Sequence, residues 1–518
     1  MVLKMSKRIS LGSTLSNTKM RTPENLSLSS GMCCVCTANC VGPCEIGLSA
    51  VRGSEAIYPY ATDINQFASE KEYSLDFSHF NINGRVFQAK GESMDPYEVT
   101  YPKAEIKTTF GIKNPIPVKG PYILPAIAKL NWQDYYAGAA VFGVPVVIGE
   151  DVVAKDKALE LDHNKVINSP LIKEMVDTLR KYYHGYGDII LQANMDDEYL
   201  GVLDYAIEKL GVESVEIKFG QAAKGIQGMG RIKDINDALK FQKMGYVVYP
   251  DPSDSKIAEA YKSGIGQVFE RIGKLPVWDE DHFEKRIAEL REKGAKRICF
   301  KTGPFDPEDL LRILKIASKC EVDLVTFDGA GGGTGNSPVK MMNEWGIPTV
   351  ELECIVYALL EKIYSEGYKK VQVAITGGIA MEDQVYKALS LGAPYINFVA
   401  IGRAAMAAAI SGKHVGNAID NGKIFPDIQR FGNTKEEIFE DIKQLKTIYE
   451  DAVSLPAGAI GVYSYLERVS TGVKQLMALN RRFDIKDISR ADILPMTALA
   501  SEVSGLDSYS KRLSKILK

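Results

Sequence analysis

The sequence predicts an α/β protein with a (β/α)8 TIM barrel, an N-terminal cysteine-rich region and a helical C-terminal extension. Short apolar runs rich in β-branched residues alternate with amphipathic helical stretches in the middle of the chain, which is typical of parallel strands joined by helices. Eight such runs fall within about 270 residues, and this number and size match a (β/α)8 barrel. A chain of 518 residues, 45% of them apolar, can bury a core of this size.

The expected strands are Val146–Ile148, Asp188–Gln192, Val215–Phe219, Tyr246–Tyr249, Arg297–Lys301, Leu324–Asp328, Val371–Thr376 and Tyr395–Ala400. The expected helices between them include Pro170–Tyr183, Tyr199–Leu210, His282–Lys293, Pro307–Ala317 and Met381–Leu391. A doubly wound parallel sheet is the alternative architecture. The barrel is favoured because no Gly-x-Gly-x-x-Gly motif opens the first strand–helix unit.

Five of the eight cysteines lie between Cys33 and Cys44, a clustering that indicates metal binding in a cytosolic chain. The spacing C-x2-C-x3-C-x3-C selects Cys33, Cys36, Cys40 and Cys44 as ligands, with Cys34 as an alternative to Cys33. Such short spacings between thiolates favour a [4Fe–4S] cluster, with structural zinc or redox-active thiols as the alternatives. The remaining cysteines are expected to be small buried apolar residues; they are Cys299, Cys320 and Cys354.

These patterns divide the chain into three regions. Residues 1–140 show no long periodic pattern, and we expect them to form the iron–sulfur-binding region. Residues 141–430 are expected to form the barrel. Residues 431–518 are expected to form a helical extension that clamps the barrel or makes a subunit contact, with helical patterns over Thr434–Val453 and Ser464–Phe483.

Charge and hydropathy exclude several classes of protein. Lys and Arg total 63 and Asp and Glu total 66, so the net charge of −3 provides no positive field for nucleic acid or anionic lipid. No run of about 18 apolar residues marks a membrane span. The basic, Ser/Thr-rich segment 1–30 lacks the apolar stretch of a secretory signal. We therefore expect a cytoplasmic protein that binds neither nucleic acid nor a membrane.

Glycine and arginine residues at the ends of the last two expected strands indicate a phosphate site. The active site of a (β/α)8 barrel lies at the carboxyl ends of its strands. Thr376 is followed there by Gly377 and Gly378, and Ala400-Ile401 by Gly402 and Arg403. Glycine backbone N–H groups, a helix N-terminus and a guanidinium group all suit a phosphate dianion.

Two lysines occupy expected strands near the same end of the barrel. Lys301 ends one strand, while Lys218 lies near the end of another and is followed by Gln221 and Lys224. A lysine in a barrel mouth requires an anionic or electron-rich partner, and pairing with a buried Asp or Glu is the structural alternative to ligand binding. The glycine-rich segment after Asp328 is either a mobile lid or a wall along which a flat ligand approaches the backbone.

Five motifs together resemble the FMN-binding synthase domain of the glutamate synthase family, in its archaeal, glutaminase-less type, over roughly residues 130–500. They are IKFGQAAKG (Ile217–Gly225), GAGGGTGNSP (Gly329–Pro338), the pair ITGGI and AIGRAAMAA, and the closing segment Asp487–Leu494. The resemblance implies an FMN site formed by Gln192, Lys301, Gly332, Gly333, Thr334, Gly377, Gly378, Gly402 and Arg403. It implies catalytic roles for Lys218, Gln221, Lys224 and Lys301.

The reaction implied by the resemblance is that of a flavoprotein oxidoreductase in glutamate biosynthesis. It reduces 2-iminoglutarate, formed from 2-oxoglutarate and ammonia, to L-glutamate. A ferredoxin or an NAD(P)H-oxidising subunit is the expected electron donor, acting through the [4Fe–4S] cluster onto FMN. Self-association into a homo-oligomer is left open.

Two departures from the family pattern leave the substrate open. The segment after Lys224 reads GIQGMG where the family has PGEGG, and no cysteine follows the last expected strand. The alternatives are an FMN/iron–sulfur oxidoreductase acting on a different keto acid, imine or amino acid, and a non-catalytic electron-transfer subunit. A Schiff-base lyase or aldolase that uses Lys218 or Lys301 as the nucleophile is a further alternative.

Overall fold

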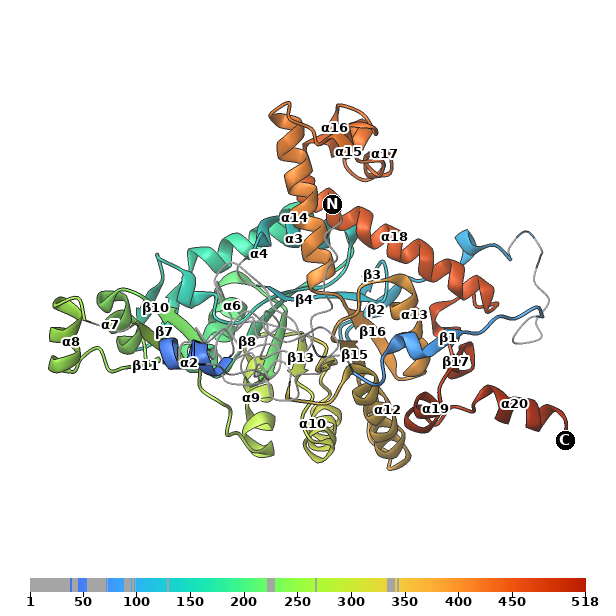
Figure 1. Cartoon of the computed structure of the whole chain (residues 1–518), viewed down its shortest axis with the longest axis horizontal. Coiled ribbons are helices and arrows are strands. Elements are labelled where there is room, and N and C mark those ends of the chain that lie inside the picture. Colours follow the sequence, from blue (N-terminus) through green and yellow to red (C-terminus); the bar gives the residue numbers. More distant parts are fainter. Residues whose placement is uncertain are drawn as a thin grey trace.

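A closed barrel of eight parallel strands forms the centre of the molecule (Figure 1). The computed structural model describes residues 38–39, 45–53, 71, 73–87, 95, 97, 99–127, 130–220, 229–265, 268–332, 341 and 344–518. In spatial order the barrel strands are β13 (Arg297–Thr302), β14 (Leu324–Asp328), β15 (Gln372–Thr376), β16 (Ile396–Ala400), β4 (Tyr122–Ile127), β5 (Val146–Ile148), β8 (Ile189–Ala193) and β9 (Ser214–Phe219). The predicted (β/α)8 barrel is therefore confirmed, and the doubly wound alternative is wrong.

Seven of the eight predicted strands lie in the barrel, and one prediction is wrong. Residues 246–249 contribute β11 (Val247–Tyr249) to a separate antiparallel sheet with β10 (Met229–Ile232) and β12 (Phe269–Ile272). The eighth strand of the barrel is instead β4, which lies before residue 141, where the barrel was expected to begin. The error has a physical reason, since periodicity does not distinguish a short strand of an insertion from a buried barrel strand. Pro125 within β4 also weakens its strand pattern.

The outer layer consists of helices that follow the barrel strands. They are α3 (Trp132–Phe142), α4 (Pro170–Tyr182), α5 (Met195–Leu200), α6 (Val202–Leu210), α9 (Glu280–Glu292), α10 (Pro307–Lys319), α12 (Thr349–Ser365), α13 (Glu382–Leu391) and α14 (Arg403–Asp420). The predicted helices are confirmed within a few residues. In α4, for example, Pro170 occupies the first turn and the Ser169 side chain accepts a hydrogen bond from the backbone N–H of Ile172.

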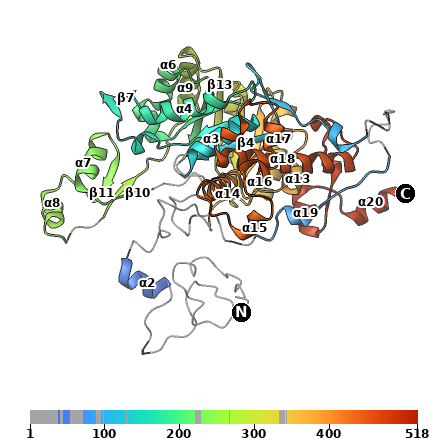
Figure 2. The ribbon, with the colours of Figure 1, turned by 90° about the horizontal axis from the view of Figure 1, so that it is seen from above.

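An insertion between β9 and α9 forms a small lobe. It contains the β10–β12–β11 sheet, α7 (Ile235–Lys243) and α8 (Ser255–Lys262), and Figure 2 shows it to one side of the barrel. Its own apolar core consists of Ile232, Ala238, Val248 and Phe269. A second pair of short strands, β6 (Glu160–Asp162) and β7 (Lys165–Asn168), precedes α4.

The C-terminal extension packs against the outer helices of the barrel. Its longest helix, α18 (Ala457–Leu479), lies against α14, α3 and α13 (Figure 1). The predicted helix over 434–453 is replaced by two short helices, α16 (Lys435–Ile438) and α17 (Ile442–Leu445), which follow α15 (Pro426–Gln429). Further on, β17 (Ile493–Pro495) pairs with β1 (Phe80–Ile82), and α19 (Ala498–Ser504) and α20 (Tyr509–Ile516) follow. The N-terminal region also contains α2 (Glu45–Arg52).

The amino-terminal end of the barrel is filled with apolar side chains. A hairpin of β2 (Thr108–Phe110) and β3 (Ile116–Val118) places Phe110 and Val118 in a buried cluster with residues of the barrel strands, including Phe398. The rings of Phe110 and Phe398 meet edge to face with their centroids 6.4 Å apart. Buried polar contacts also occur at this end, where Arg297 at the start of β13 pairs with Asp188 at 3.0 Å. No helix in the described part of the chain is long and apolar enough to span a membrane.

Candidate active site

The two predicted lysines lie side by side at the carboxyl-terminal end of the barrel. Lys218 of β9 and Lys301 of β13 are register partners, and both are buried. The Lys218 ammonium donates to Glu150, which follows β5, at 2.5 Å, and the Lys301 ammonium donates to Asp328 at 2.9 Å. Pairing with carboxylates, the alternative that the sequence left open, is thus what the structure contains.

The environment of Lys301 keeps its ammonium charged. Burial by itself lowers the pKa of a lysine, but the carboxylates of Asp328 and Glu216 outweigh burial and raise the pKa of Lys301 above its ordinary value. Lys301 therefore presents a fixed positive charge within a water-poor part of the barrel. Such a charge stabilises electron density that develops on a neighbouring ligand.

Gln192 of β8 lies one strand further around the barrel, opposite Glu216 in the strand register. Its side-chain N–H group donates a short hydrogen bond to Glu216, and both side chains are almost completely buried. The amide oxygen of Gln192 is also buried and has no hydrogen-bond partner in the described part of the chain. Burial raises the pKa of Glu216, although Lys301, Gln192 and Lys218 oppose that effect.

Two glycine turns after β14 and β15 are held against each other. The backbone N–H of Gly329 donates to Thr376 O, and the Thr349 hydroxyl donates to Gly377 O, both at 2.8 Å. Gly377 has φ = 127°, and a Cβ atom there would lie 2.5 Å from the Thr349 oxygen. The neighbouring Gly378 also has a left-handed φ, of 87°. Only glycine fits this turn without strain.

The N-terminus of α14 lies at the end of the adjacent strand, β16. Gly402 is its N-cap residue and supplies no side-chain cap, and Arg403 is the first helical residue. Within the described residues, the Arg403 guanidinium makes no hydrogen bond or ion pair. Burial lowers its pKa, against an opposing effect of Asp328. The first turn of an 18-residue helix and a guanidinium group are therefore available to an anion.

Several predicted site residues fall outside the described part of the chain. They are the cluster ligands Cys33, Cys36, Cys40 and Cys44, the substrate residues Gln221 and Lys224, and the loop residues Gly333 and Thr334. Gly332 is described, and its backbone N–H donates to Gly329 O at 2.9 Å. Among described residues, no group of three or more His, Cys, Asp or Glu side chains forms a metal site. The prediction that Cys299 and Cys354 are buried is confirmed, whereas Cys320 is partly exposed.

Sequence reasoning missed an ion pair that joins the insertion lobe to the barrel mouth. Arg271 of β12 donates to both carboxylate oxygens of Asp151, which follows Glu150, at 3.0 and 2.8 Å. Burial would raise the pKa of Asp151, but Arg271 outweighs it and holds the pKa well below the usual range. Lys274, just after β12, pairs similarly with Asp196 at 2.9 Å. No local pattern reveals a contact between residues 120 positions apart.

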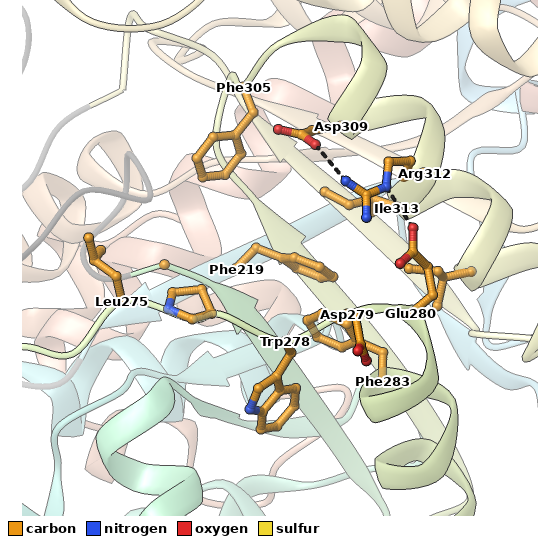
Figure 3. Close-up of a pocket in the computed structure, with 13 residues that line it drawn as sticks. Phe219, Leu275, Trp278, Asp279, Glu280, Phe283, Phe305, Asp309, Arg312 and Ile313 are labelled. Atoms are coloured by element: carbon orange, nitrogen blue, oxygen red, sulfur yellow. Dashed lines mark hydrogen bonds and ion pairs between the residues drawn. The ribbon is translucent and has the colours of Figure 1, made fainter.

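A cavity of about 340 Å³ lies between β9, α9 and α10, on the face of β9 that carries Phe219 (Figure 3). The aromatic rings of Phe219, Trp278, Phe283 and Phe305 line it. At its edge the Arg312 guanidinium donates to Glu280 at 2.6 Å and to Asp309 at 3.4 Å. Because Phe219 follows Lys218 in β9, its side chain lies on the opposite face of the strand, and the cavity is separate from the barrel mouth.

Comparison with known proteins relates part of the chain to one family. A family model described as a conserved region in glutamate synthase matches residues 275–412, which contain Lys301, Gly377 and Arg403. The archaeal glutamate synthase [NADPH] of Methanocaldococcus jannaschii is 36% identical over 202 residues, which cover 38% of this chain and 34% of that protein. A glutamate synthase large subunit-like protein of Rhizobium meliloti is 37% identical over 136 residues, which cover 26% of this chain and 29% of that protein. The matches thus span about a third of the curated relatives' length.

The solved structures that match most of the chain do so with low identity and with TM-scores below 0.5. A flavocytochrome b2 variant with sulfite bound has a TM-score of 0.46 and 14% identity, covering 85% of this chain and 82% of that one. A structure of (S)-mandelate dehydrogenase has a TM-score of 0.42 and 13% identity, and the match covers 81% of this chain and 89% of that one.

Proposed function

We propose that this chain is an FMN- and iron–sulfur-dependent oxidoreductase of glutamate synthase type, a proposal supported by the match of residues 275–412 to a conserved region in glutamate synthase. It reduces 2-iminoglutarate, formed from 2-oxoglutarate and ammonia, to L-glutamate. The observation that carries this proposal is the neighbouring pair of buried ammonium groups, Lys218 and Lys301, at the same end of the barrel as the N-terminus of α14. A keto-dicarboxylate and a flavin phosphate both require such positive charge.

The residues present fit FMN. The uncapped N-terminus of α14, the Arg403 guanidinium and the turn at Gly377 and Gly378 suit its phosphate. The unpartnered amide oxygen of Gln192 suits a ring N–H group, and the charged Lys301 suits an electron-rich ring. Gly332, Gly333 and Thr334 are proposed to line the ring side. When bound, FMN supplies hydride transfer.

The substrate is proposed to bind next to Lys218. A substrate carboxylate competes with Glu150 for the Lys218 ammonium; Lys224 is proposed to add a second positive charge and Gln221 a neutral hydrogen-bonding group. Ammonia condenses with the keto group of 2-oxoglutarate and releases water, which gives the imine that is reduced. The burial of Lys218 and Lys301 keeps bulk water away from this charge and strengthens their interaction with the substrate.

Electron delivery is proposed to use the cysteine segment. Cys33 or Cys34, with Cys36, Cys40 and Cys44, would hold a [4Fe–4S] cluster, which would supply single-electron transfer between a ferredoxin or an NAD(P)H-oxidising subunit and the barrel. The spacing of the four thiolates supports this part of the proposal.

A steady-state assay tests the proposed reaction. The anaerobically purified chain, loaded with FMN and given a chemical reductant, is supplied with ammonium and 2-oxoglutarate, and L-glutamate is measured. Formation of L-glutamate supports the proposal. Turnover with other keto acids but not with 2-oxoglutarate identifies a different substrate. Absence of any substrate-dependent flavin oxidation favours a non-catalytic electron-transfer subunit, and trapping by borohydride of a substrate on Lys218 or Lys301 identifies a Schiff-base enzyme.

A further inference from the structure

We infer that Glu216 is a positioning residue that fixes the amide group of Gln192 so that its carbonyl oxygen accepts a hydrogen bond from the bound cofactor. This inference rests on the proposed binding of FMN. Glu216 thereby selects a ligand that carries an N–H donor at this end of the barrel.

The evidence is the hydrogen bond between two buried side chains on neighbouring strands. Gln192 is 1% exposed and Glu216 is 2% exposed, and the strand register places them opposite each other. The Gln192 Nε2 atom donates to Glu216, so one end of the amide is occupied. The other end, Oε1, is buried and unpartnered in the described part of the chain. A buried acceptor without a donor is costly, which makes it a candidate for a ligand contact.

The chemistry of a carboxylate explains why the amide has one orientation. An ionised carboxylate accepts hydrogen bonds and donates none, so it faces the N–H side of an amide. Rotation of the Gln192 amide would place its oxygen against the carboxylate oxygen and create repulsion. Burial raises the pKa of Glu216 and the Lys301 and Lys218 ammonium groups oppose that effect, and in the structure the Glu216 carboxyl group accepts from the Gln192 N–H group. The carbonyl of Gln192 is therefore the end that is left for a ligand.

FMN carries a matching donor, because its ring contains an imide N–H between two carbonyl groups. An amide held with its oxygen outward accepts from that N–H, whereas an amide free to rotate also presents its own N–H group to it. The contribution of Glu216 is thus one of ligand selection, and it is measured by comparing FMN with N3-methyl-FMN, which lacks the imide N–H.

The test is equilibrium binding of FMN and of N3-methyl-FMN to the full chain from which flavin has been removed. Wild type is expected to bind FMN at least about tenfold more tightly than the methylated analogue. Glu216→Gln is expected to reduce this ratio at least about threefold, because a neutral amide at position 216 pairs with either end of Gln192. Any steric effect of the methyl group is common to both proteins and cancels in this comparison. Glu213→Gln is the matched control; Glu213 lies just before β9 and pairs with Lys296 at the opposite end of the barrel.

A double variant keeps the test decisive if Glu216→Gln alone does not fold. The exchange Gln192→Glu with Glu216→Gln preserves the pair and an outward oxygen, and it is expected to retain the wild-type ratio. The inference is overturned if wild type binds both flavins equally, if folded Glu216→Gln keeps the full ratio, or if the folded exchange variant loses it. Failure of wild type to bind FMN at all instead contradicts the proposed function.

Discussion

Lys218 and Lys301 are register partners on β9 and β13, yet each ammonium is held by a different carboxylate, Glu150 and Asp328 respectively. Two like charges side by side on neighbouring strands repel each other. The structure offsets this repulsion with one carboxylate for each lysine and with Glu216 nearby. Each ammonium is therefore paired with a carboxylate in the chain without ligand, so an anionic ligand has to compete with Glu150 or Asp328 for it.

Replacement of Asp328 by Asn tests how much the Lys301 charge depends on its partner. We expect Asp328→Asn to lower the free energy of unfolding by about 3 kcal/mol, because a buried ammonium loses its ion-pair partner. Urea-induced unfolding at neutral pH measures this change. Asp309→Asn is the control, since Asp309 is exposed and pairs with Arg312 at 3.4 Å, and we expect less than about 1 kcal/mol there. Equal effects of the two substitutions would contradict this interpretation of the pair.

Substitution of Gly377 tests the proposed phosphate turn. A Cβ atom at this position meets the Thr349 oxygen at 2.5 Å, and the left-handed φ adds strain. We expect Gly377→Ala to weaken FMN binding at least about tenfold while changing riboflavin binding much less, because riboflavin lacks the phosphate.

Gly367→Ala is the matched control for this variant. Gly367 also has a left-handed φ, of 88°, but a Cβ atom there meets nothing within 4 Å. Fluorescence titration with the two flavins compares both variants with wild type. A parallel loss of FMN and riboflavin affinity in Gly377→Ala would place the phosphate elsewhere.

The Asp151–Arg271 pair predicts a pH-dependent contribution to stability. Arg271 lowers the pKa of Asp151 in the folded state, so the stabilisation is present above the unfolded pKa of about 3.9 and is lost as the pH falls below it. We expect Asp151→Asn to be less stable than wild type by about 3 kcal/mol at pH 7, with a difference that shrinks below about pH 4.

Unfolding midpoints measured between pH 3 and pH 7 check this expectation. Asp162→Asn, an exposed carboxylate of β6 beside His163, is the control and should show a small difference at every pH. If the difference in stability between Asp151→Asn and wild type were the same at pH 3 and at pH 7, ionisation of Asp151 would not explain that difference.

Replacement of a single cysteine tests the proposed cluster. We expect Cys36→Ser to abolish most of the bound iron and acid-labile sulfide, because a [4Fe–4S] cluster needs four protein ligands. Cys320→Ser is the control, since Cys320 lies far from the segment in sequence and is expected to leave the iron content unchanged. Stoichiometric zinc in the wild-type protein, without iron, would contradict the cluster.

The sequence predicts the barrel because strand and helix periodicities are local properties, and seven of its strands follow from them. It also places Lys218 and Lys301 at the same end of the barrel, because parallel strands align their carboxyl ends. It does not reveal their ion-pair partners: Glu150 lies 68 residues from Lys218, and only the closed barrel brings them together. The Arg271–Asp151 pair is hidden for the same reason, and β4 is missed because a proline interrupts its pattern.

The barrel mouth is proposed to bind FMN beside a cationic site for the imine of a keto-dicarboxylate. The most direct test is a single-turnover experiment under anaerobic conditions, in which the FMN-loaded, reduced full chain is mixed with 2-oxoglutarate and ammonium. We predict oxidation of the flavin with formation of about one L-glutamate per FMN, and slower oxidation in Lys301→Met than in the surface control Lys319→Met. A reduced flavin that stays unchanged in the presence of both substrates would contradict the claim.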